Sequence, residues 1–261
     1  MKILKNVLLA PFTTFKIGGP AEYFCLVKTT ADLIKTVDYA YSRQLKLYIF
    51  GKGSNILIPD SGLKGLVIIN RTGRIKILNN NQAELDSGVF LPKAALYLIK
   101  HGLIGLEKFA GIPATIGGAT AVRMHGVGVK WSDFIVSVKK YREVILSVII
   151  QLHSGDPVAA ETEFKRIQLA KRHQPQHSAG CVFINPNGES AGAIIDKKLH
   201  LKGITIGQAQ IAPEHANFIK NLGKASAADV LALIKLIETT AWKKLKLKFK
   251  REVIVYESIN H

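Results

Sequence analysis

The chain has 261 residues, of which 48% are hydrophobic and 21% charged, and its formal net charge is +17. This length allows one large domain or two modest ones with a substantial core, and the composition is that of a globular protein. No apolar run approaches the roughly 18 residues that a membrane-spanning helix needs. The opening segment MKILKNVLLAPF has too short an apolar core for a secretory signal. We therefore expect a cytoplasmic protein without membrane insertion.

The excess of basic residues favours a phosphate-bearing ligand, either a nucleotide or a nucleic acid. The lysines are dispersed, however, and in the densest run, residues 243–250, they alternate with Leu245, Leu247 and Phe249. This alternation predicts a strand with one solvated face rather than a nucleic-acid-binding surface. We expect no specific nucleic acid partner.

Helix and strand signals alternate along the chain. In order, the predicted elements are a helix after Thr30, strands at 47–50, 56–58 and 66–69, a helix between Pro92 and Gly102, a strand at 144–152, a helix at 159–171, a helix from about Ala227 and a closing strand that ends near Tyr256. Ser226 and Asp229 form a capping-box pattern at the start of the last helix. The sequence predicts an α+β fold with two domains.

Two glycine-rich segments could hold a phosphorylated cofactor. GKGSN, residues 51–55, follows a strand, and its glycines allow backbone N–H groups to approach an anion. It matches neither the Walker loop nor the G-x-G-x-x-G fingerprint, so a simple tight turn remains an alternative. Residues 110–118, AGIPATIGG, are small enough to lie against a ligand. Their alternative is a solvent-exposed loop.

The two cysteines differ in their surroundings. Cys25 lies in the apolar run YFCLV and is predicted to be strand filler, whereas Cys181 lies in the turn SAGCVFINP. A free thiol, with a pKa of about 8.5, can donate a proton near neutral pH. Neither cysteine has a metal-type spacing, and we expect no disulfide and no metal site.

Several strings of this sequence together resemble one family. The segments TTFKIGGPAEYF, GKGSNILI, GLEKFAGIPATIGGA, SAGCVFINP, SAGAIID, HANFIKN and REV are similar to those of the UDP-N-acetylenolpyruvoylglucosamine reductase (MurB) family. These flavoenzymes make UDP-N-acetylmuramate for the bacterial cell wall. The resemblance covers nearly the whole chain and is to the shorter subtype, with deletions in the FAD domain before and after Tyr141 and Arg142.

The resemblance implies a two-lobed FAD-binding domain of the PCMH/vanillyl-alcohol-oxidase type at 1–153 and a smaller α+β substrate domain at 154–261. It implies FAD as cofactor and NADPH as co-substrate. It also implies that the enolpyruvyl group of a UDP-sugar is reduced in peptidoglycan synthesis, and we expect a monomer. The implied FAD contacts are Gly51, Gly53, Ser54, Asn55, Gly111, Thr115, Gly117 and Gly118.

Three catalytic residues follow from the same resemblance. Cys181 matches the residue that donates the proton. Arg142 matches the arginine that stabilises the enolate-like negative charge on the substrate. Glu252, on the closing strand, matches the glutamate that assists this enolate-like intermediate. Asn185 matches a substrate contact, and His215 is expected to be a packing histidine. Two alternatives stay open: a catalytically decayed flavin-binding relative and, less favoured, a basic nucleic-acid-binding protein.

Overall fold

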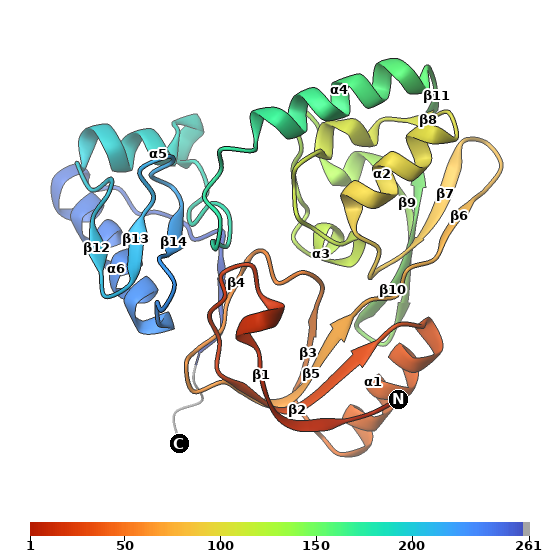
Figure 1. Ribbon diagram of the computed structural model, residues 1–261, viewed down its shortest axis with the longest axis horizontal. Coiled ribbons are helices and arrows are strands. Elements are labelled where there is room, and N and C mark those ends of the chain that lie inside the picture. Colours follow the sequence, from red (N-terminus) through yellow and green to blue (C-terminus); the bar gives the residue numbers. More distant parts are fainter. Residues whose placement is uncertain (258–261) are drawn as a thin grey trace. The chain divides into compact units, whose positions relative to one another are not determined.

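The computed structural model describes residues 1–257 and divides into two compact units (Figure 1). The first unit consists of Met1–Leu4, Phe24–Lys52 and Gly65–Arg172, and the second of Lys5–Tyr23, Gly53–Lys64 and the chain from His173 onward. Each unit thus combines segments that are far apart in the sequence. The division into domains at 1–153 and 154–261, of which residues 258–261 lie outside the described part, stays a prediction.

One sheet contains four strands in the order β1-β2-β5-β3. Their bounds are Leu4–Leu8, Pro20–Val27, Leu63–Asn70 and Leu47–Phe50. Strand β3 has the predicted bounds and pairs with β5 in parallel. Helix α1 (Thr30–Ser42) follows β2, and the Thr29 hydroxyl caps it by accepting a hydrogen bond from the N–H of Asp32. The helix therefore begins at Thr30, next to the predicted start.

The second sheet lies entirely in the first unit and is antiparallel, in the order β6-β7-β10-β9. Its strands are Ile75–Ile77, Gln82–Asp86, Val144–Gln151 and Ile135–Tyr141. Helices α2 (Leu91–Lys100), α3 (Ile116–Ala121) and α4 (Pro157–Ala170) and the short pair β8 (Leu103–Ile104) and β11 (His153–Ser154) complete this part. Phe109, Trp131 and Phe164 are fully buried in the core that these elements share.

The second unit is built around a small antiparallel sheet, β12-β13-β14. These strands are Thr205–Ile206, Ala209–Ile211 and Ile219–Asn221, and helix α6 (Ala227–Leu245) packs beside them (Figure 1). Helix α5 (Ala191–Ala193) continues into a π-helical turn, Ile194–Lys198. Strands β4 (Ile56–Leu57) and β15 (Ile254–Val255) form a parallel pair in the same unit.

Helix α6 is capped from two places. The predicted capping box is confirmed, because the Ser226 hydroxyl accepts from the N–H of Asp229 and the Asp229 carboxylate accepts from the N–H of Ser226, each at 3.0 Å. The Asp60 carboxylate, from a loop far away in the sequence, accepts from the N–H groups of Ala227 and Ala228 at 2.8 and 3.2 Å. The first turn of α6 thus carries two carboxylates, as the helix dipole favours.

The prediction of a strand at 243–250 is wrong. Helix α6 extends to Leu245, Lys246 adopts a left-handed conformation with φ 54°, and residues 247–250 are not in a strand. The side chains of Leu247 and Phe249 do pack against the core, as their spacing predicted, but no strand of the described part of the chain pairs with them. Lys243 and Lys244 instead occupy the last turn of a helix, where cations suit the dipole.

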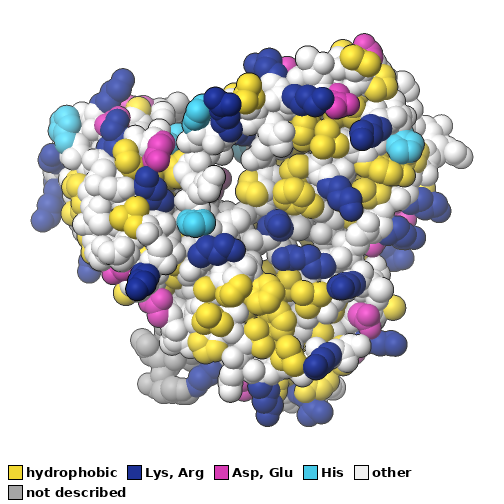
Figure 2. Space-filling view, viewed as in Figure 1, with side chains coloured by type: hydrophobic (Ala, Val, Ile, Leu, Met, Phe, Trp, Pro, Cys, Tyr) yellow, Lys and Arg dark blue, Asp and Glu magenta, His cyan; other side chains and the backbone are white. Residues whose placement is uncertain are grey.

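Basic side chains are spread widely. Figure 2 shows the Lys and Arg side chains scattered over the visible face rather than gathered into one stripe. Among the described residues, no helix is both long and apolar enough to cross a bilayer.

Candidate active site

The first part of the GKGSN loop belongs to the first unit. Gly51 follows β3, and its carbonyl oxygen accepts a hydrogen bond from Arg71 Nη1 at 2.6 Å. A Cβ added to Gly51 would collide with the side chain of Thr115. Only glycine therefore allows the loop to lie against Thr115, and the fold brings these two predicted cofactor residues together.

The second glycine-rich segment ends in a short helix rather than staying a loop. Thr115 caps α3, since its hydroxyl accepts from the N–H of Gly118 at 3.3 Å. The N–H of Gly117 donates to the carbonyl of Ser87 at 2.8 Å, and a Cβ on Gly117 would come within 2.9 Å of the Ser87 Cβ. Gly111, with φ 74°, lies against the side chain of Lys171. The backbone of this segment is close enough to its neighbours that glycine is required at Gly117.

The rest of the GKGSN loop belongs to the second unit. Gly53 has φ 61°, and a Cβ there would approach the carbonyl of Phe12 to 2.7 Å. The backbone N–H groups of Gly53, Ser54 and Asn55 donate to no acceptor among the described residues. Backbone donors that are free and held by positive-φ glycine are a common way to bind phosphate. Each glycine-rich segment, taken by itself, fits the dinucleotide cofactor that the sequence predicts.

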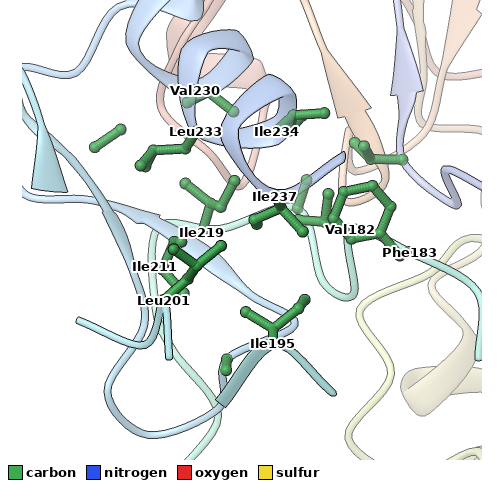
Figure 3. Close-up of a cluster of buried hydrophobic side chains, with 14 of the residues drawn as sticks. Val182, Phe183, Ile195, Leu201, Ile211, Ile219, Val230, Leu233, Ile234 and Ile237 are labelled. Atoms are coloured by element: carbon green, nitrogen blue, oxygen red, sulfur yellow. The ribbon is translucent and has the colours of Figure 1, made fainter. Parts of the chain in front are cut away.

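Cys181 lies in the second unit in a loop that several elements hold. The carbonyl of Val182 accepts from the N–H of Glu252 at 2.8 Å, and Phe183 forms a bridge with Arg251. Figure 3 shows the side chains of Val182 and Phe183 within the buried cluster that includes Ile237 of α6. The thiol thus precedes two residues that are anchored in the core.

The surroundings of the thiol favour its protonated form. Burial, together with the negative charge of Glu252, raises the pKa of Cys181 to about 11, and a hydrogen bond from the Asn217 side chain offsets only part of this shift. The described residues contain no disulfide, and both Cys25 and Cys181 are free thiols. Cys181 is therefore a thiol that keeps its proton at neutral pH.

Glu252 lies beside the thiol but not on a strand. It is two residues before β15, between the bridge at Arg251 and the start of that strand. Partial burial raises the pKa of its carboxyl group, although part of the residue stays exposed. Asn55 Nδ2 donates to the carbonyl of Glu252 at 3.2 Å, so a predicted cofactor residue and a predicted catalytic residue are joined within one unit.

Sequence reasoning did not single out Asn217, which links the parts of this site. Its side chain is 2% exposed; Oδ1 accepts from the N–H of Phe183 at 3.0 Å and Nδ2 donates to the carbonyl of Phe183 at 2.8 Å. The string HANF shows an asparagine among apolar residues, which needs partners if it is buried, but it does not show that Phe183 provides them. His215 packs edge-on against Phe218, and burial lowers its pKa, as a packing histidine should.

Asn185 and Arg142 have structural partners of their own. Asn185 is exposed, and its Oδ1 accepts from the N–H of Ala191 at 2.9 Å. Arg142 lies in the first unit at the tip of the β9–β10 hairpin, with φ 51°; its Nη2 is 3.5 Å from an Asp38 carboxylate oxygen, and its guanidinium lies 4.1 Å from the ring centre of Tyr41. Cys181 and Glu252 lie in the second unit. The roles of Asn185 and Arg142 stay predictions.

Comparisons with known proteins agree with this fold. Residues 21–144 match the family model described as an FAD binding domain, and residues 172–256 match the one described as the UDP-N-acetylenolpyruvoylglucosamine reductase C-terminal domain. The chain is 35% identical to the UDP-N-acetylenolpyruvoylglucosamine reductase of Protochlamydia amoebophila, over 95% of this chain and 92% of the relative. It is 31% identical to that of Carboxydothermus hydrogenoformans, over 97% and 93%.

A solved structure gives the same result. The crystal structure of the enzyme (MurB) from Thermus caldophilus matches with a TM-score of 0.81 and 29% identity, over 98% of this chain and all of the other. The matched domains and the α+β fold define an FAD-dependent oxidoreductase. More specifically, the chain belongs to the UDP-N-acetylenolpyruvoylglucosamine reductase family. The predicted family, the α+β fold and FAD as cofactor are confirmed.

Proposed function

We propose that this protein reduces UDP-N-acetylglucosamine enolpyruvate to UDP-N-acetylmuramate, with FAD as cofactor and NADPH as reductant, in the synthesis of peptidoglycan precursors. The observation that carries the proposal is the protonated thiol of Cys181 beside Glu252, in a chain of this family. Reduction of a carbon–carbon double bond needs a hydride and a proton. FAD supplies the hydride chemistry when it is bound, and the protein has to supply the proton.

The glycine-rich segments are proposed to hold the cofactor. In the second unit, the free N–H groups of Gly53, Ser54 and Asn55 would bind a phosphate. In the first unit, Gly51 and Thr115 are proposed to contact the cofactor. Gly111, Gly117 and Gly118 are proposed to line the rest. The tight contacts at Gly51 and Gly117 support this assignment. A residue without a side chain at these positions allows a ligand to approach the backbone directly.

Cys181 is proposed to donate the proton to the carbon next to the one that receives the hydride. A thiol with a pKa near 11 keeps its proton in neutral solution and releases it to a strongly basic carbanion. Burial, and to a smaller extent the charge of Glu252, keeps the thiol protonated until the carbanion develops. Arg142 is proposed to stabilise the charge on the substrate carboxylate, and Asn185 to contact the substrate.

Separate measurement of the two half-reactions tests the proposal. Apo-protein titrated with FAD should become yellow, NADPH should bleach it, and the enolpyruvyl substrate should restore the colour. Cys181→Ala should keep the NADPH step and lose product formation, whereas Cys181→Ser should retain much of the activity because a hydroxyl also carries a proton. Protein that FAD cannot colour, or equal loss of both steps in Cys181→Ala, would contradict the proposal.

The protein is further proposed to act as a monomer in the cytoplasm on a UDP-sugar, without a specific nucleic acid partner. On the face shown in Figure 2 the basic side chains are dispersed, which supports the absence of a specific nucleic acid partner, because a nucleic-acid-binding protein gathers basic residues on one face. Sedimentation of the FAD-loaded protein tests the monomer. Retention on DNA that depends steeply on ionic strength would contradict the last point.

A further inference from the structure

A cavity of about 580 Å³ lies in the first unit, and no proposed cofactor, substrate or catalytic residue lines it. Its volume falls within the range of small-molecule sites. The cavity is formed where the end of β2, the start of α1 and the segment after β5 meet the open face of the β6-β7-β10-β9 sheet. The lining residues are Lys28, Thr29, Thr30, Arg71, Gly73, Arg74, Glu84, Asp86, Lys139, Leu146 and Ser147.

The carboxylates of this cavity are already satisfied. Arg74 lies 3.3 Å from a Glu84 oxygen and 3.7 Å from an Asp86 oxygen, and its backbone N–H donates to Asp86 at 3.0 Å. The Ser147 hydroxyl donates to Glu84 at 2.9 Å. One arginine thus offsets one of the two acidic charges, and the cavity contains three further cations.

Three of the lining cations, Lys28, Arg71 and Lys139, have no carboxylate partner among the described residues. The two lysines are exposed, but Arg71 is half-buried, and burial lowers the pKa of its guanidinium. Arg71 Nη1 donates only to the carbonyls of Gly51 and Asn70. Because no carboxylate among the described residues balances its charge, the guanidinium is available to an anionic ligand.

The start of helix α1 adds donors at the same wall. The Thr29 hydroxyl is occupied by the N–H of Asp32, but the N–H groups of Thr30 and Ala31 have no acceptor among the described residues. These groups lie at the positive end of the dipole of a 13-residue helix. Together with the unpaired cations, they suit a doubly charged oxyanion better than a single carboxylate.

We propose that this cavity binds a small phosphate-bearing molecule, with its phosphate between Lys28, Arg71 and the first turn of α1. The cavity is larger than a phosphate ion, so a phosphate ester or a diphosphate is the chemical class that fills it. Lys139, on β9, also lines the cavity and would contact the rest of the ligand. None of the proposed FAD or substrate contacts lines this cavity, although Arg71 donates to the carbonyl of Gly51, and in this respect the inference rests on the proposed function.

The competing explanation is that these cations serve phosphates of FAD or of the UDP-sugar. Isothermal titration with inorganic pyrophosphate therefore uses protein saturated with both FAD and the UDP-sugar product. One saturable site is expected. The Lys28→Ala/Lys139→Ala double variant should weaken pyrophosphate binding at least about tenfold, and ADP should bind with the same dependence on these lysines. Both residues are exposed, so the variant is expected to fold normally, which its unfolding temperature checks.

A matched control removes the same charge elsewhere. The Lys243→Ala/Lys244→Ala variant, on α6 in the second unit, should leave pyrophosphate binding unchanged. Equal weakening in both double variants would show diffuse attraction and overturn the proposal, as would absence of saturable binding or its disappearance when FAD and product are bound. Turnover without pyrophosphate should be the same in the cavity variant and the wild type. Failure of the product to bind in its own titration contradicts the proposed function, not this site.

Discussion

The side chain of Asn217 and the backbone of Phe183 form a pair of hydrogen bonds, 3.0 and 2.8 Å long, across 34 positions of the sequence. The backbone carbonyl of Asn217 also accepts from the N–H of Val182 at 2.8 Å. One buried asparagine therefore fixes the two residues that follow Cys181. The position of the thiol therefore depends on a residue outside its own loop.

We expect Asn217→Ala to lose product formation while NADPH still reduces the flavin, because the substitution frees the loop that places the thiol. Two backbone groups of Phe183 would also lose their partners, at a cost of roughly 2–4 kcal/mol of unfolding free energy. Stopped-flow absorbance of the two half-reactions and a urea titration check both effects. Asn187→Gly, which keeps the positive φ of an exposed residue in the same loop region, is the control. An equal loss in both half-reactions would contradict a role in positioning the thiol.

The second prediction concerns the pH dependence of the thiol. Below its pKa, which is about 11, Cys181 is protonated and resists alkylation; above it the thiolate reacts. Glu252→Gln removes a negative charge that raises this pKa, so the midpoint of alkylation should move to lower pH. The rate of iodoacetamide labelling against pH measures the midpoint, in a Cys25→Ala background. Glu189→Gln, which removes an exposed carboxylate that pairs with Lys198, should leave it in place. An unchanged midpoint in Glu252→Gln would show that the two groups do not interact.

Gly51→Ala should weaken FAD binding. The added methyl group collides with Thr115, so the loop must move away from the position in which it could approach the cofactor. We expect at least about a tenfold rise in the dissociation constant, equivalent to about 1.4 kcal/mol, measured by quenching of flavin fluorescence. Gly73→Ala is the control, because its nearest contact is a carbonyl oxygen at an ordinary 3.9 Å. Equal affinity in the two variants would remove Gly51 from the cofactor site.

Asp60→Ala should destabilise the second unit by about 1 kcal/mol, as loss of a helix cap usually does. The carboxylate accepts from Ala227 and Ala228 at the start of α6, and alanine leaves these N–H groups to water. Chemical denaturation followed by circular dichroism measures the change. Glu189→Ala removes a surface ion pair only and should change stability less. If both variants unfold at the same denaturant concentration as the wild type, Asp60 does not stabilise the start of α6.

The predicted catalytic role of Arg142 has a distinct signature. If the guanidinium stabilises charge on the substrate, Arg142→Ala lowers product formation by about a hundredfold or more and leaves NADPH oxidation intact. Asp38→Asn, which removes the carboxylate that Arg142 contacts at 3.5 Å, should leave both steps unchanged. Steady-state kinetics with the enolpyruvyl substrate decide the matter. Small and equal effects of the two substitutions would mean that Arg142 only fastens the β9–β10 hairpin to α1.

Local signals in the sequence predicted the elements that local chemistry specifies. The capping box at Ser226 and Asp229 marked the start of α6, and Gly102, with φ 75°, marked the end of α2. The alternation at residues 243–250 led to a wrong strand prediction because alternation indicates only which side chains are buried. It does not show whether a neighbouring strand is present to pair with the backbone.

The contacts within the candidate site were harder to predict from the sequence. Cys181 and Glu252 followed from the family resemblance, and their proximity appears only in the fold. Asn217 was missed because its partner, Phe183, lies in another segment. No local sequence pattern indicates a hydrogen bond between residues 34 positions apart. The interest of Arg71 as an anion contact was also missed. It depends on partial burial and on the absence of a carboxylate partner among the described residues, and the sequence shows neither.

The pairing of β15 with β4 has a consequence for biosynthesis. The second unit takes one strand of this pair from residues 56–57 and the other from residues 254–255, so β4 has no partner in this pair until Ile254 and Val255 have been synthesised. A strand edge that stays unpaired during synthesis can pair with another chain. A nonsense codon or a proteolytic cut before residue 254 would leave β4 permanently in that state.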